Sequence, residues 1–187
     1  MTDMSKITVR EAGTGRGLQG RLPVGIALVL VVALVVAVLL AAAMVRSQPV
    51  GPLGLAVVPA PAADSAACAR LLAALPETLD GGELGVLGRR QLSAPIPPGA
   101  AGWGEPPVVL RCGLDRPTDL TATSRLLSVS GVQFLEIPSL GMSTWAAVDR
   151  PAYVAVTLPP GSGSGPLQQI AGVVSRTLPA QEVNIPH

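Results

Sequence analysis

The stretch WGEPPVVLRCG, residues 103–113, contains one of the two tryptophans, two adjacent prolines and one of the two cysteines of the chain. Proline has no backbone N–H to donate to a sheet, so a strand is predicted to begin only after Pro107. Successive side chains of a strand point to opposite faces. Cys112 is therefore predicted to face the core, and Arg111 to point to the opposite face.

Helix and strand patterns lie on both sides of this strand. A helix is predicted between an N-cap at Asp64 or Ser65 and Pro76, and another between Pro166 and Pro179. Further strands are predicted at residues 84–92, 131–137, 144–148 and 153–158, residues 95–104 are predicted as a loop, and the pattern of residues 118–128 is ambiguous. This order predicts an α+β fold in which an antiparallel sheet carries two helices on one face.

Residues 24–45 form an uninterrupted apolar run without a charged side chain. A helix of that length rises about 33 Å, enough to cross a hydrocarbon core of about 30 Å. Basic residues outnumber acidic ones before the run, and eight arginines face ten acidic residues after Arg46. The positive-inside rule then predicts a cytoplasmic tail (1–23), a transmembrane helix (24–45), a Pro-rich spacer (46–63) and an extracytoplasmic domain (64–187).

A cleaved signal peptide is the alternative reading of the apolar run. The apolar core of a signal peptide usually has about 7–15 residues, which is shorter than the run at residues 24–45. The length therefore favours a retained single-pass anchor in the cytoplasmic membrane, and a secreted protein remains the second possibility.

The two cysteines, Cys68 and Cys112, both follow the predicted anchor, on the side where disulfides persist. Each is predicted on a core-facing side, one on a helix and the other on a strand, so a disulfide would join helix to sheet. A reactive thiol pair is the alternative, but the chain has no C-x-x-C spacing to support it.

A G-x-G-x-x-G match at residues 15–20 lacks the βαβ unit that a dinucleotide site needs, and other motifs for catalysis or cofactor binding are missing from the sequence. The only histidine is the terminal residue His187, no G-x-S-x-G occurs, and two cysteines alone do not make a tetrahedral zinc site. The acidic residues are scattered and single out no catalytic pair. A net charge of +1 and a total of four aromatic residues argue against nucleic-acid binding. We expect no cofactor and no metal.

A candidate interaction surface follows from the predicted sheet. Arg111 on the open face would contact a ligand or partner, or would pair with an acid such as Glu105 or Asp149 if that face is covered. Asp149 and Arg150 lie in the turn before the last strand, and Trp145 either packs in the core or lines a partner-binding groove. The candidate surface therefore comprises Arg111, Trp145, Asp149 and Arg150.

WGEPPVVLRCG followed by Pro117, together with GVQFLEI at 131–137, Arg150 and VAVTLP at 154–159, resembles an actinobacterial family of domain of unknown function 3515. The similarity includes Cys68 and the Leu-Pro at 75–76, and Phe134 stands where members tend to carry tryptophan. The resemblance implies a small membrane-anchored or exported envelope protein. It supplies no catalytic residues.

The sequence thus predicts a non-enzymatic envelope protein that binds another envelope protein or serves as an accessory subunit. One alternative is a small-ligand-binding domain or weak hydrolase acting on cell-wall material. The other is a secreted factor released by signal cleavage.

Overall fold

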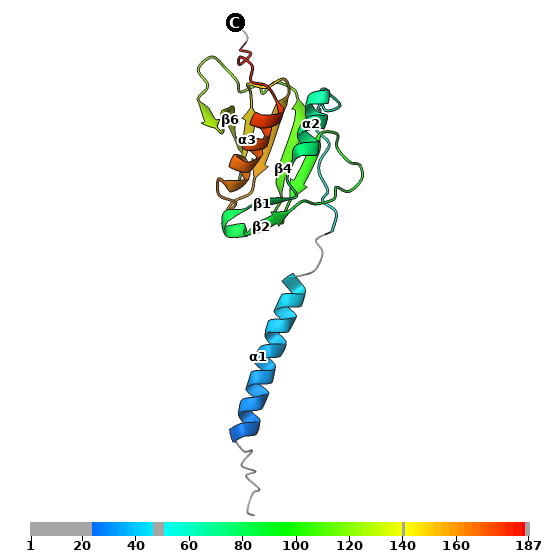
Figure 1. Ribbon diagram of the computed structural model, residues 1–187, viewed down its shortest axis with the longest axis vertical. Helices are drawn as coiled ribbons and strands as arrows, with labels where there is room; N and C mark the ends of the chain where they lie inside the picture. The colour runs from blue at the N-terminus through cyan, green and yellow to red at the C-terminus, as the bar shows by residue number, and fades with distance from the viewer. Residues whose placement is uncertain (1–23, 47–50, 140, 186–187) are drawn as a thin grey trace, which may run out of the picture. The chain divides into compact units, whose positions relative to one another are not determined.

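A computed structural model describes residues 24–46, 51–139 and 141–185, and the chain divides into two compact units at Pro49 and Val50. The first unit contains α1 (Val24–Arg46) (Figure 1). Side chains are described only for residues 25–41 of this helix, and no helix in the described part of the chain has both the length and the hydropathy to cross a membrane. The predicted tail, residues 1–23, lies outside the described residues.

The second unit is built on a six-stranded antiparallel sheet. Its spatial order is β3 (Ala100–Trp103), β4 (Val108–Leu114), β8 (Tyr153–Leu158), β7 (Met142–Ala147), β6 (Val132–Ser139) and β5 (Leu126–Val129). The helices α2 (Ala66–Ala74) and α3 (Gly165–Thr177) lie on the same face of this sheet (Figure 1). The predicted α+β class with an antiparallel sheet is confirmed.

The main core lies between the two helices and the sheet. From β4 it takes Val108, Leu110 and Cys112, all fully buried, because alternate residues of the strand face the helices. A second, smaller cluster lies on the other face, where residues around Leu120 pack against Leu135. We call the two sides of the sheet the helix face and the opposite face.

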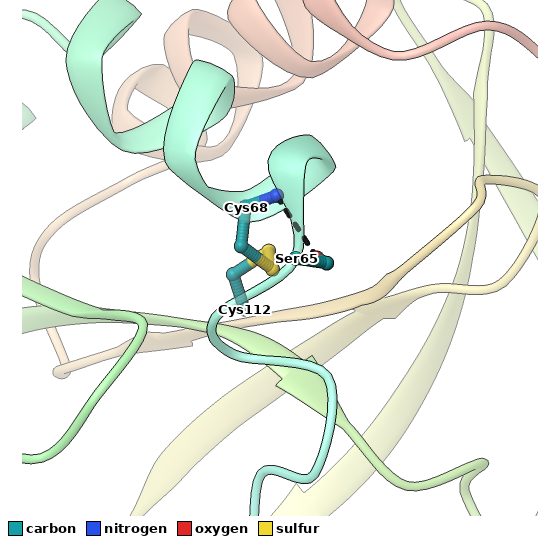
Figure 2. Close-up of a disulfide and its surroundings, with 3 residues drawn as sticks. All are labelled: Ser65, Cys68 and Cys112. Carbon is teal, nitrogen blue, oxygen red and sulfur yellow. Dashed lines mark hydrogen bonds between the residues drawn. A yellow bond between two sulfur atoms is a disulfide. The ribbon is translucent and has the colours of Figure 1, made fainter.

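The disulfide between Cys68 and Cys112 is confirmed, with the two Cα atoms 5.7 Å apart (Figure 2). It joins the first turn of α2 to β4, and both cysteines are fully buried. Ser65 is the N-cap of α2, and its hydroxyl accepts a hydrogen bond from the backbone N–H of Cys68 at 3.3 Å. The alternative of an exposed reactive thiol pair does not fit this burial.

Two short strands were not expected, one at residues 78–80 and the other β3. β1 (Thr78–Asp80) and β2 (Val86–Gly88) form a two-stranded sheet, and a 3₁₀ turn, η1 (Gly82–Leu84), lies between them. The predicted strand at 84–92 is thus shorter, because Gly85 turns the chain with a φ of 71°. The loop predicted at 95–104 contains β3, which forms by pairing with β4, and the ambiguous residues 118–128 lead into β5.

The described part of the predicted spacer, residues 51–63, packs against the domain instead of standing apart from it. Leu53 is buried, and its backbone bonds to Gln91 and Ser93. Ala62 donates its N–H to the carbonyl of Gly113 at 3.0 Å. The second unit therefore begins before the predicted boundary at residue 64, because the segment is attached to the domain at Leu53 and Ala62 although most of its residues stay exposed.

Candidate binding groove

Arg111 lies on the opposite face of the sheet, half-buried, as the strand alternation predicts. Its guanidinium donates a hydrogen bond to the carbonyl of Ala56 at 2.9 Å. Partial burial disfavours the charged form and lowers the pKa of Arg111. The predicted pairing with Glu105 or Asp149 is wrong, because the described ion pairs join those carboxylates to Arg90 and Arg150.

Asp149 and Arg150 form a buried ion pair, with each residue only 6% exposed and a shortest N···O distance of 2.7 Å. Arg150 also donates to the carbonyl of Gly131, at 2.8 Å, in the turn between β5 and β6. The carbonyl of Asp149 accepts from the N–H of Gln181, at 2.9 Å, in the C-terminal segment. These two residues hold three segments together inside the protein. The expected interaction surface therefore does not form around them.

Trp103, the first tryptophan of the chain, belongs to the core. It is fully buried and donates its indole N–H to the carbonyl of Pro76 at 2.9 Å. The guanidinium of Arg89 lies 5.8 Å from the centre of the indole and donates to the carbonyls of Leu72 and Leu75, which end α2. Trp103 therefore has a packing role.

Trp145 has a different environment, because it lies half-buried on the helix face of β7. It stands opposite Val156 of β8 and Glu136 of β6 in the sheet register. Its indole N–H bonds to the hydroxyl of Ser143 on the same strand at 3.3 Å. Neither helix buries this side chain fully, so part of the indole faces the surface.

A groove passes over Trp145 and consists of two adjoining hollows. The first, about 300 Å³, lies between the start of α3 and the sheet; its lining includes Val129, Leu158, Leu167 and Gln168. The second, about 260 Å³, has Arg125, Phe134 and Glu136 in its lining. Both hollows share Leu127 and Trp145. We refer to the two together as the Trp145 groove.

The chemistry of the two hollows differs. Aliphatic side chains and the indole dominate the first hollow, which suits an apolar group. In the second hollow, exposed Arg125 and Glu136 bring one positive and one negative charge to the lining, which suits a longer group with a polar end. The described residues contain no cluster of three or more metal-ligating side chains. The groove can therefore bind an amphipathic group, and its lining supplies no evident catalytic pair.

Of the four predicted surface residues, the structure places Trp145 alone in the groove. Leu127 and Val129 were missed because the pattern before residue 129 was ambiguous, and their role depends on pairing with β6. The sequence places Leu158 and Leu167 at apolar positions of a predicted strand and a predicted helix. It does not show whether such a position lines a groove or lies in the core.

No curated protein and no solved structure matches the chain. One family model does match, over residues 28–183, which is most of the chain and includes the strand that carries Arg111, both cysteines and the residues of the Trp145 groove. By that match, the chain belongs to the family described as Protein of unknown function (DUF3515).

Proposed function

We propose that this chain is a membrane-anchored, non-enzymatic binding protein of the cell envelope, and that the Trp145 groove is its binding site. The single observation that carries the binding role is a half-buried tryptophan at the junction of two open hollows. Tryptophan is over-represented among the residues that contribute most to binding energy. A purely structural tryptophan is better served by the environment of Trp103, which is fully buried.

The anchor in this proposal rests on the amino-acid sequence of residues 24–45. The run lacks charged side chains over its whole length, including the positions whose side chains lie outside the described residues. The excess of basic residues before the run supports a cytoplasmic N-terminus. The domain that starts near residue 50 would then face the outside of the cytoplasmic membrane, where the disulfide is stable.

The anchor is tested by alkaline extraction of membranes and by identification of the N-terminus of the mature protein. We expect the full chain in the membrane pellet, with residues after Arg46 digested by protease added to the outside of spheroplasts. A mature N-terminus that begins after Ala43 or Ala63, with the protein in the medium, would instead support the secreted alternative.

The binding site is tested by site-specific photo-crosslinking in intact cells. A photoreactive residue at Leu127, in the groove, is compared with one at Val86, which is exposed but lies on the separate β2 strand. We expect a discrete adduct from position 127 only, which disappears when Trp145→Ala is added. Equal adducts from both positions, or an adduct that Trp145→Ala leaves unchanged, would refute the groove as the binding site.

A further inference from the structure

β5 is an edge strand of the six-stranded sheet, and its hydrogen-bonding pattern can be worked out from the turn that follows it. Ser130 and Gly131 both have positive φ angles, 50° and 75°, which is typical of a two-residue type I′ turn. Such a turn makes Val129 and Val132 a hydrogen-bonded pair. Since hydrogen-bonded pairs alternate along an antiparallel ladder, Leu127 also bonds to β6.

The same alternation directs the backbone N–H and C=O groups of Leu126 and Ser128 away from β6. The carbonyl of Gln133, the residue opposite Ser128, accepts from Val148 at 3.0 Å and so points away from β5, as this pattern requires. No backbone hydrogen bond outside the sheet reaches Leu126 or Ser128 in the described residues. The outer edge of β5 therefore presents two donors and two acceptors.

The other edge of the sheet, β3, is closed. Its Gly102 accepts from the N–H of Arg90 at 2.9 Å, and Gly104, just beyond the strand, donates to Gly88 at 2.9 Å. A bridge between Arg89 and Trp103 completes this contact. Proteins normally protect edge strands from pairing by covering them, by proline or by inward charges. The chain covers β3, whereas no part of the described chain covers β5 by backbone hydrogen bonds, and the strand contains no proline.

The Trp145 groove lies beside this open edge on the helix face. Leu127 is 49% exposed and belongs to both hollows. Val129 of β5 lines the first hollow, and Arg125, the residue just before the strand, lines the second. An added strand would lie about 4.8 Å from β5, and its side chains at i and i+2 would stand about 7 Å apart on the helix face. Two alternate side chains can thus reach the two hollows.

We infer that the partner binds as an extended peptide segment that adds a strand to the outer edge of β5. This inference rests on the proposed function of the Trp145 groove and specifies how the partner is recognised. Backbone bonds to Leu126 and Ser128 supply affinity, as in other strand-addition complexes. Specificity comes from alternate side chains, an apolar one for the first hollow and one with a polar end for the second.

A second copy of this chain fits the site less well. Pairing of two β5 strands would join segments of only four residues each. Between Leu126 and Ser128, whose backbone groups would form the hydrogen bonds, each copy has a single side chain, Leu127, to contact the groove of the other. Stable interfaces usually bury more than about 1,000 Å². A separate peptide can extend past both ends of β5 and use the hollows at the same time.

The test uses Ser128→Pro, with Ser128→Ala as the matched control. Proline at position 128 removes an N–H that points away from β6, so it blocks pairing with a partner while the β5–β6 ladder stays intact. The probe is a library of short random peptides, selected against the full chain in lipid nanodiscs. We expect the enriched peptides to alternate apolar and polar residues and to bind wild type and Ser128→Ala equally. We expect Ser128→Pro to weaken their binding about tenfold or more.

The outcomes separate this inference from the proposed function. Peptides that lose binding with Trp145→Ala but not with Ser128→Pro would keep the groove as the site and refute strand addition. Peptides insensitive to Trp145→Ala would refute the groove itself. Selection that yields no peptide, or dimers of the full chain that Ser128→Pro abolishes, would overturn the inferred occupant. Unchanged amide spectra of β6 in Ser128→Pro would show that the variant is folded.

Discussion

Removal of the Cys68–Cys112 disulfide gives the most quantitative prediction. The bond closes a loop across 44 residues. In the chain-entropy model, a loop of that size stabilises the folded state by about 4 kcal/mol at 25 °C. The free energy of unfolding of the double variant Cys68→Ala/Cys112→Ala should be lower than that of the wild type by this amount. For a domain of this size, the difference corresponds to a decrease in Tm of about 14 °C. Because both cysteines are fully buried, the two alanines would gain no contact with solvent that offsets this loss of stability.

The measurement is chemical denaturation of the full chain in detergent micelles, followed by tryptophan fluorescence, since Trp103 is fully buried and reports the core. Ser65→Ala is a suitable control, because it removes the hydrogen bond to the N–H of Cys68 and leaves the disulfide intact. We expect the control to lose about 1 kcal/mol. A double variant that loses no more than this control would refute the idea that the disulfide stabilises the domain by linking α2 to β4.

Three further comparisons test other parts of the structure by chemical denaturation followed by circular dichroism, because one of the variants removes Trp103 itself. Gly113→Ala should cost about 4 kcal/mol, because φ is 84° and a Cβ would lie 2.2 Å from a backbone nitrogen, whereas Gly88→Ala, with open space around it, should cost less than about 1 kcal/mol. Trp103→Phe should lower the free energy of unfolding by about 2 kcal/mol, because it removes a buried hydrogen bond, and Trp145→Phe should lower it by less than about 0.5 kcal/mol. A larger loss from Trp145→Phe than from Trp103→Phe would contradict the packing role of Trp103 and the groove position of Trp145. Arg150→Met should cost about 3–5 kcal/mol by leaving a buried carboxylate without its ion pair, and retention of wild-type stability would show that this pair is dispensable.

The sequence was most informative where local pattern and long-range packing agree. The last strand has the predicted bounds, Tyr153–Leu158, because it is apolar, contains β-branched residues and lies in the middle of the sheet. The helix beginning near Pro166 has a clear apolar face and start signal. The disulfide could be predicted because each cysteine falls on the inward side of its own element.

The short elements could not be predicted, because partners distant in sequence make them. β3 has the sequence AAGW, which carries no strand pattern, and it is a strand because Gly102 and its neighbours pair with β4. β5 likewise depends on β6. The groove escaped prediction for the same reason, since its lining comes from β5, β7, β8 and α3. The burial of Arg150 depends on a carbonyl 19 residues away, which no local pattern reveals.

The position of the disulfide has a mechanical consequence for a chain that is pulled at its N-terminal side. Tension applied ahead of residue 51 would first detach the backbone contacts of Leu53 and Ala62, which hold the leading segment to the domain. Unravelling would then stop at Cys68, after an extension of at most about 60 Å. From there the covalent bond transfers the load directly to β4, which lies between β3 and β8 in the sheet. Force would therefore reach the interior of the sheet without peeling α2 away from it.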